Sequence, residues 1–250
     1  MMFDEIIYIV GDKFGRLSDI ASIKTVTQLK QAVVQKKIHS ETVLVFSQGL
    51  NEAEKSEISC LIRKSTANII INAYQKPARS EHTHKKDIKN ILVSDPVVLS
   101  AGKKFRSQLL IDDDCAEMSD HVTGVHIQGM LLIEAARQLA IAVSEKFLLE
   151  TKDCYFLLKS MSTLFNKFIF PMDVIIEQEI VEIKILRAGF KDIAIRTVFI
   201  QNGEVASSVD MELRINAKTL LEKIEYQMAS EMIMKNTLIV AEDVYFDRVG

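Results

Sequence analysis

Two histidines and a carboxylate lie close together in the segment HVTGVHIQGMLLIEAARQ. His121 and His126 precede a long apolar run, and Glu134 lies inside that run. An imidazole and a carboxylate that face one reacting group can act as its general base and general acid. The same three side chains, with Asp120 or Cys115, also have the types that hold a metal ion, so a metal site is the alternative. We favour acid–base chemistry and expect no metal.

Two glycines in this segment suit the binding of a carbonyl group. Gly124 and Gly129 lie in the loop and at the start of the apolar run, next to Asp120 and the histidines. The first turn of a helix has unpaired backbone N–H groups and the positive end of the helix dipole, which together stabilise an oxyanion. A glycine lets a ligand approach such backbone closely. We therefore expect Asp120, Gly124 and Gly129 to contact substrate.

The apolar run predicts a long helix over residues 127–148 with one polar stripe. At 100° per residue, Glu134, Gln138 and Glu145 fall near one face, and Arg137 lies three residues after Glu134. A helix that is apolar over the rest of its circumference must be enclosed by other elements. Its stripe then faces substrate, or Glu134 and Arg137 form an ordinary ion pair on an edge. We place Arg137 and Gln138 among the candidate substrate-binding residues.

The strands needed to enclose this helix follow it in the sequence. Residues 174–185 and 204–215 alternate apolar and polar side chains, which is typical of antiparallel strands with one exposed face. The segment QNGE at 201–204 has the composition of a hairpin turn. Residues 88–216 are therefore expected to form an α+β domain, an antiparallel sheet wrapped around the long central helix.

The first 75 residues predict a separate small α/β domain. Short β-rich runs alternate with helical patterns in the order β-α-β-α-β, which indicates a parallel sheet. Asn51 followed by Glu54 is an N-cap pattern for the second helix. Gly11 and Gly15 follow the first strand but match no phosphate-binding motif, so we interpret them as a turn.

Two further segments complete the expected organisation. Residues 76–87 are polar and basic and are expected to be a linker, in which His82 and His84 are solvated rather than metal ligands. Residues 217–250 predict a C-terminal helix and tail. Its apolar stripe is expected to pack on the domain or on a partner rather than on a membrane, because its polar face is not basic.

Composition excludes several classes of protein. The chain of 250 residues is 48% hydrophobic and 26% charged, which is typical of a globular protein. A net charge of -3 gives no general reason to bind nucleic acid or an anionic membrane. The three cysteines form no CxxC pair, and no apolar run is long enough to cross a bilayer. We expect a cytoplasmic protein without disulfides.

The segment HVTGVHIQGMLLIEAARQ resembles the H-x-x-G…G-x-L-x-x-E-A-x-x-Q signature of hotdog-fold β-hydroxyacyl carrier-protein dehydratases. Together with HKKDIKNILVS at 84–94, it is more similar to the A-factor biosynthesis hotdog family, the synthases of γ-butyrolactone autoregulators. The similarity covers roughly residues 82–215. It implies a hotdog fold, in which an antiparallel sheet wraps a long helix.

The resemblance also implies roles for the candidate residues. His121 or His126 takes the place of the loop histidine, Glu134 that of the helix carboxylate, and Gly124 or Gly129 that of the carbonyl donors. A-factor synthases join a β-ketoacyl thioester to a small alcohol of the dihydroxyacetone-phosphate type. The implied partners are acyl carrier protein or coenzyme A, as thioester substrate, with no further cofactor. Because one hotdog repeat is visible, a homodimer through this domain is expected.

Two other functions remain open on the sequence. A dehydratase is one, although Thr123 stands where those enzymes carry a proline. A non-catalytic acyl-binding or scaffold protein is the other, in which the first 75 residues mediate contacts. For the leading hypothesis, acyl transfer, Lys103, Arg106 and Arg137 are the basic residues considered for attracting a phosphate group.

Overall fold

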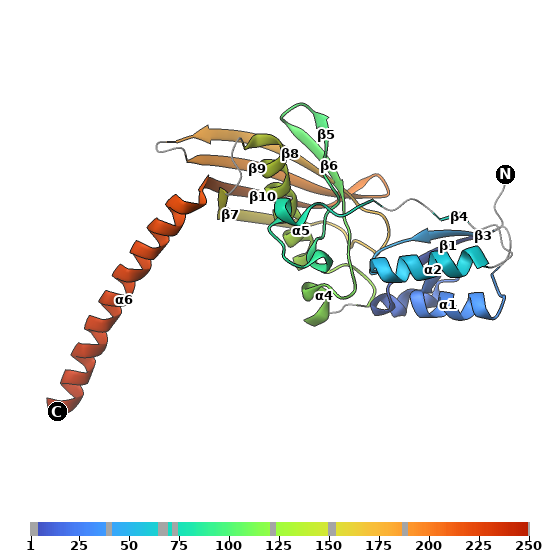
Figure 1. Cartoon of the computed structure of the whole chain (residues 1–250), viewed down its shortest axis with the longest axis horizontal. Coiled ribbons are helices and arrows are strands. Elements are labelled where there is room, and N and C mark those ends of the chain that lie inside the picture. The colour runs from blue at the N-terminus through green and yellow to red at the C-terminus, as the bar shows by residue number, and fades with distance from the viewer. Residues whose placement is uncertain are drawn as a thin grey trace.

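The computed structural model describes residues 5–38, 42–64, 70–71, 75–120, 124–149, 154–186 and 190–249. A small parallel sheet with its helices lies beside a larger antiparallel sheet, and a long helix projects from the far end (Figure 1). The chain therefore has the expected order of a small α/β domain followed by a larger α+β domain.

The N-terminal domain is a four-stranded parallel sheet in the order β2-β1-β3-β4. Its elements are β1 (Glu5–Val10), the 3-10 helix η1 (Asp12–Asp19), β2 (Ile23–Thr25), α1 (Val26–Val34), β3 (Thr42–Phe46), α2 (Glu52–Lys64) and β4 (Ile70–Ile71). Asn51 and Glu54 cap α2 reciprocally, since each accepts from the other's backbone N–H, at 3.0 and 2.8 Å. The predicted βαβαβ order is confirmed, with the short β2 as an additional strand.

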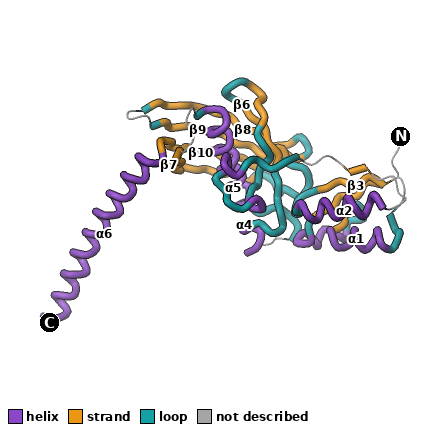
Figure 2. The backbone as a smooth tube through the Cα atoms, viewed as in Figure 1, coloured by secondary structure: helices purple, strands orange, loops and turns teal. Residues whose placement is uncertain are grey.

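The second domain is built on a six-stranded antiparallel sheet in the order β5-β6-β8-β9-β10-β7. Its strands are β5 (Val97–Ser100), β6 (Lys104–Gln108), β7 (Cys154–Phe165), β8 (Ile175–Ile185), β9 (Lys191–Gln201) and β10 (Glu204–Ala217). The predicted hairpin joins β9 to β10, where Asn202 and Gly203 both have positive φ, at 53° and 80°. These strands and their helices are distinguished in Figure 2.

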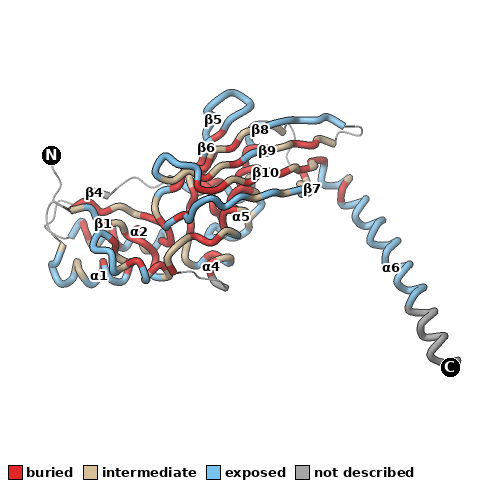
Figure 3. The backbone as a smooth tube through the Cα atoms, turned by 180° about the vertical axis from the view of Figure 1, so that it is seen from behind, coloured by how far each residue is buried: buried red, intermediate tan, exposed pale blue. Residues whose placement is uncertain are grey.

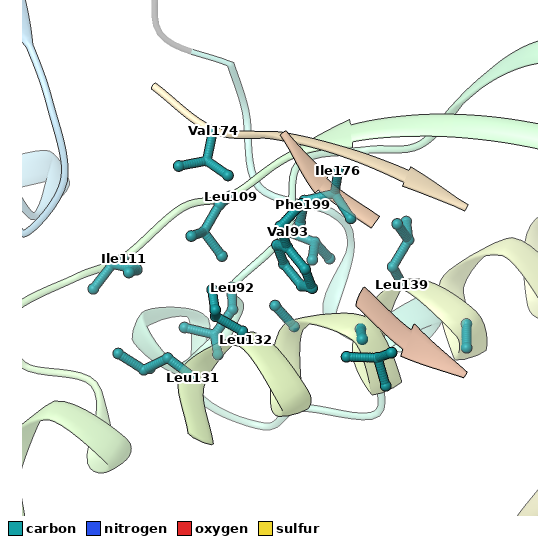
Figure 4. Packing of buried hydrophobic residues seen from close by; sticks show 14 of the residues in the cluster. Leu92, Val93, Leu109, Ile111, Leu131, Leu132, Leu139, Val174, Ile176 and Phe199 are labelled. Carbon is teal, nitrogen blue, oxygen red and sulfur yellow. The ribbon is translucent and has the colours of Figure 1, made fainter. Parts of the chain in front are cut away.

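The central helix α5 (Gly129–Val143) lies against this sheet and continues into a π-helical turn, η3 (Ser144–Leu148). It is preceded by the short α4 (Ala116–Asp120). Figure 4 shows Leu131, Leu132 and Leu139 of α5 packed among side chains of the strands, including Ile176 and Phe199. All five of these side chains are at most 2% exposed. The expected helix against an antiparallel sheet is therefore confirmed.

The two domains share one apolar core and a set of backbone contacts. Buried residues Val10, Phe14 and Leu17 belong to the same core cluster as the central helix. The Gln48 side chain donates to the Leu109 carbonyl oxygen and accepts from the Ile111 N–H, both at 2.8 Å. The parallel sheet is thus joined to the segment that leads toward the central helix (Figure 3).

The segment expected to be a linker, 76–87, is packed against the second domain. It contains α3 (Ser80–Thr83), which contacts α5, and it is followed by the 3-10 helix η2 (Ile88–Asn90). Ala78 donates its N–H to the Val93 carbonyl oxygen at 2.9 Å, and the side chain of Thr83 is fully buried. Part of this segment thus packs on the second domain, although most of its polar side chains remain exposed.

The C-terminal helix α6 (Lys218–Val249) projects away from the body of the chain (Figures 1 and 3). Leu221 is buried at its base, whereas Met228 and Met232 are 64% and 59% exposed. The expected packing of the apolar stripe on its own domain is therefore found only in the first turn. No helix in the described part of the chain is both long and apolar enough to span a bilayer.

Candidate functional site

Glu134 is the centre of a polar cluster on the face of α5 that is turned toward residues 84–92. Arg137 donates to both carboxylate oxygens at 2.7 Å, which is a bidentate ion pair. The Lys85 ammonium lies 2.8 Å from Oε1, and the Gln138 amide donates to the same oxygen at 3.0 Å. The Glu134 side chain is only 17% exposed, so these contacts compensate a mostly buried charge.

The cluster keeps Glu134 ionised. Burial would raise its pKa, but the hydrogen bonds and charges of Arg137, Lys85 and Gln138 outweigh burial and hold the pKa at about 2, below the ordinary 4.5. The same pair raises the pKa of Arg137. A general acid at neutral pH needs a raised pKa, so the surroundings of Glu134 favour an anchoring role over proton donation.

Gln138 is fully buried and connects α5 to the segment in front of it. Its Oε1 accepts from the Leu92 N–H at 2.8 Å, and its Nε2 donates to the Asn90 carbonyl oxygen at 2.8 Å. This side chain satisfies backbone groups that would otherwise be buried without partners. Gln138 was expected to bind substrate, and its hydrogen bonds in the structure indicate a structural role.

A cleft of about 780 Å³ opens beside this cluster. It is formed by α3 and the residues after it, by one face of α5 and η3, by the start of β7 and by the start of α6. Its lining residues are Ser80, Glu81, His82, His84, Lys85, Lys86, Arg137, Ile141, Glu145, Cys154, Tyr155, Phe156 and Lys218. Four Lys or Arg side chains and two carboxylates line this cleft, and Lys85 and Arg137 are also paired with Glu134. Basic side chains that gather in a cleft suit an anionic ligand.

One histidine of the cleft is paired with a buried carboxylate. The Nε2 of His84 lies 3.1 Å from Oε1 of Glu145, and its ring meets Phe156 edge-on at 5.4 Å. Glu145 is 7% exposed and His84 39% exposed. Glu145 belongs to the π-helical turn η3, and such turns are frequent at functional sites.

The candidate residues of the loop before α5 contact neighbours other than Glu134. The ring of His126 packs 4.8 Å from that of Phe168. A Cβ added to Gly129 would lie 2.7 Å from Cζ of Phe165, so an aromatic ring covers this glycine. Gly124 has a φ of 78° and packs against Arg16 of the N-terminal domain. Thus Glu134, Arg137 and Gln138 are brought together, whereas Gly124 and Gly129 pack against separate neighbours.

The side chains of two candidate residues lie outside the described part of the structure. His121 lies outside the described residues, and the side chain of Asp120 is likewise outside them. Among the residues that the structure does describe, no three His, Cys, Asp or Glu side chains lie close enough to hold a metal ion. The roles assigned to His121, His126 and Asp120 stay predictions.

The basic side chains that line the cleft were not predicted from the sequence. His84, Lys85 and Lys86 come from the segment interpreted as a solvated linker, yet they line the cleft with Arg137. A signal was present, because HKKDIKNILVS carried part of the family resemblance. Of the basic residues considered for phosphate, Arg137 lines the cleft, whereas Lys103 and Arg106 pair with Glu179 and Glu177.

Comparison with known proteins bears on the same part of the chain. The family model described as the A-factor biosynthesis hotdog domain matches residues 71–216, more than half of the chain. A search of curated proteins found no match. Among solved structures, the dehydratase heterocomplex ApeI:P from Xenorhabdus doucetiae is similar over 60% of this chain and 98% of that chain, with 13% identity and a TM-score of 0.44.

A mutant thioesterase from Pseudomonas aeruginosa is similar over 52% of this chain and 86% of that chain, with 11% identity and a TM-score of 0.38. A thioesterase from Haemophilus influenzae is similar over 56% of this chain and 82% of that chain, with 9% identity and a TM-score of 0.37.

Proposed function

This chain belongs to the A-factor biosynthesis hotdog family, and on that premise we propose that it transfers a β-ketoacyl group from a thioester to a small phosphorylated alcohol. The family is one of hotdog proteins that process acyl thioesters. Acyl carrier protein or coenzyme A is the proposed acyl donor.

The basic side chains that line the cleft are the observation that carries this proposal. Lys85, Lys86, Arg137 and Lys218 come from three separate parts of the chain and line one cavity of about 780 Å³. A phosphate ester carries the charge and the acceptor oxygens that such groups bind. Tyr155 and Phe156 add an aromatic wall, which suits the carbon skeleton of a bound alcohol or acyl group.

The polar cluster supports the same proposal. Because Glu134 is ion-paired to Lys85 and Arg137 at 2.8 and 2.7 Å, it holds both cations at the edge of the cleft. Positioning of charged groups before the substrate arrives reduces the cost of organising the site. Glu134 therefore contributes by holding the binding residues, and the proton is transferred elsewhere.

The experiment is a product assay. The purified protein would be incubated with a β-ketoacyl thioester of coenzyme A or of carrier protein, together with dihydroxyacetone phosphate or unphosphorylated dihydroxyacetone. We expect free thiol and an ester of the phosphorylated alcohol, both detected by mass spectrometry. Absence of any ester from either donor would contradict the proposal.

A matched pair of lysine variants tests the cleft. Lys218→Met should raise the KM for the phosphorylated alcohol roughly tenfold, about the effect of losing one charge-assisted hydrogen bond. Lys223→Met is the control, because Lys223 is exposed on the same helix and does not line the cleft. Equal effects of the two substitutions would argue against phosphate binding here.

Non-catalytic acyl binding is the second candidate. It is favoured by the ion-paired state of Glu134, which leaves the helix carboxylate without a proton to give at neutral pH. A protein of this kind would retain the acyl thioester in equilibrium dialysis and release no thiol. Dehydration of a hydroxyacyl thioester would appear in the same assay as a loss of water from the acyl chain.

We further propose that the chain acts as a homodimer through the hotdog domain. Strand β7 is one of the two edges of its sheet and, among the described strands, pairs only with β10; it is twelve residues long. Its residues Leu158, Leu164 and Phe165 are 49%, 60% and 54% exposed. An open strand edge with exposed apolar side chains is a surface that a second copy can cover.

A further inference from the structure

We propose that His84, held by Glu145, is the general base that removes the proton from the acceptor alcohol; this rests on the proposed function. The two side chains form a hydrogen-bonded pair at 3.1 Å, and both line the cleft. A base whose ring is fixed by a carboxylate is the arrangement that activates hydroxyl nucleophiles in unrelated enzymes.

Glu145 and His84 differ in burial, and this difference assigns orientation to the carboxylate and proton transfer to the imidazole. Glu145 is 7% exposed, so its carboxylate is fixed within the protein, whereas His84 at 39% exposed is accessible to a ligand. A buried carboxylate orients the ring and stabilises the imidazolium that forms during proton transfer. The edge-on contact with Phe156 restricts the ring further.

The backbone at His84 is consistent with a site that must hold one orientation. His84 follows α3 with φ and ψ of 55° and 31°, which is the left-handed conformation. Non-glycine residues adopt this conformation uncommonly, and the surrounding structure has to maintain it. The next residue, Lys85, is fixed by its 2.8 Å ion pair with Glu134, so the segment is held directly after the histidine.

The neighbouring His82 shows that the pairing is particular to His84. Its Nε2 lies 3.5 Å from Glu81, whose side chain is 58% exposed. That carboxylate is solvated and gives the ring weak orientation. Two histidines that are alike in the sequence therefore differ in the structure, and only His84 has the buried carboxylate.

The proposed step is balanced in atoms and electrons. The alcohol O–H gives its proton to the imidazole of His84, and the oxygen forms a bond to the thioester carbonyl carbon. The carbon–sulfur bond then breaks, and the leaving thiolate takes the proton back from the imidazolium. The products are one ester and one thiol, and no oxidant, reductant or metal takes part.

The first experiment separates chemistry from binding. In His84→Gln, the new amide can still donate to Glu145 but cannot accept and return a proton. We expect kcat to fall roughly 10²- to 10⁴-fold, with the KM of both substrates changed less than about threefold. Lys89→Gln, on the same segment and outside the cleft, should keep the kcat of the wild type. A kcat for His84→Gln within about threefold of wild type would overturn the assignment.

The second experiment uses readouts that a structural role would not change. Added imidazole should restore part of the kcat of His84→Ala, and the acidic limb of the wild-type kcat profile should be absent from His84→Gln. Other ionisable side chains line the same cleft, so imidazole rescue is measured in addition to the pH profile; they are Glu81, His82, Lys85, Lys86, Arg137, Glu145, Cys154, Tyr155 and Lys218. The assignment would be overturned if imidazole fails to rescue His84→Ala and the acidic limb persists in His84→Gln.

Two other results need their own measurements: His84 variants that do not fold, and a wild-type protein that makes no ester. If the His84 variants do not fold, Glu145→Gln decides. Loss of the carboxylate that orients the ring should lower kcat at least about tenfold, with KM changed less than about threefold; an unchanged kcat would refute the pair. If wild-type protein makes no ester, the proposed function fails by itself. His84 is then judged on thioester hydrolysis, in which water replaces the alcohol.

Discussion

At the scale of single residues, the surroundings of a side chain decide its chemistry more than its type does. Glu134 has the type and spacing of an acid–base catalyst, but four donor contacts from three neighbours keep it ionised. Glu145 was noted only as a member of the polar stripe, yet it is the carboxylate paired with a histidine in the cleft.

The lowered pKa of Glu134 predicts how stability depends on pH. Its ionised form stabilises the fold above the ordinary pKa of 4.5, and that contribution is lost as the pH falls toward about 2. Glu134→Gln should therefore reduce the free energy of unfolding by about 3 kcal/mol at pH 7, because Lys85 and Arg137 lose their partner. The loss relative to wild type should shrink below pH 4.

Urea denaturation at pH 7 and at pH 3 measures this difference. Glu177→Gln is the control. Glu177 pairs with Arg106 near the surface, where the two side chains are 32% and 46% exposed. That substitution should cost less than about 1 kcal/mol. Equal stability of Glu134→Gln and wild type at pH 7 would contradict the anchoring role.

At the scale of elements, the start of the central helix is packed against the end of an edge strand. A side chain at Gly129 would meet the ring of Phe165, with the added Cβ 2.7 Å from Cζ. Gly129 was predicted from the sequence to leave room for a ligand, and in the structure that room is occupied by Phe165. The glycine thus allows α5 and β7 to approach each other.

Double substitution tests this contact. Gly129→Ala should destabilise the protein by about 1 to 3 kcal/mol through overpacking against Phe165. In a Phe165→Ala background the same change should cost clearly less, because the ring is gone. Chemical denaturation of the four proteins gives the coupling energy. A coupling near zero would show that the glycine is needed for something other than packing.

At the scale of the whole molecule, apolar side chains are exposed on several elements. They include the edge strand β7 and the stripe along α6, where Met232 is 59% exposed. The two domains, in contrast, are joined by a shared core and by the hydrogen bonds of Gln48. Association between copies is therefore expected at an exposed surface, which we assign to β7, and not at the domain junction.

Sedimentation equilibrium tests the proposed dimer. Wild type should have twice the chain mass of 28.3 kDa. Leu164→Lys on β7 should shift the equilibrium toward monomer, because a charge would be buried at the interface. Met232→Lys makes the same kind of change on α6 and should leave the dimer intact. Dissociation by the α6 substitution alone would assign the interface to that helix.

The sequence by itself determined the main elements of both domains and their order. The helical period of residues 129–143 and the two-residue alternation of β8 and β10 are local patterns of side-chain burial, so they can be read without a structure. The family resemblance, carried by HKKDIKNILVS and HVTGVHIQGMLLIEAARQ, indicated the hotdog fold. The capping pair Asn51 and Glu54 was predictable because its two partners are three residues apart.

Only the tertiary structure decided what the polar residues meet. His84 and Glu145 are 61 residues apart, and Lys85 and Glu134 come from different elements, so no periodicity connects them. Whether a basic segment is solvated or forms the wall of a cleft depends on the surface that it packs against. That surface is built by α5, β7 and α6 together, and burial and charge at the site exist only once these elements are assembled.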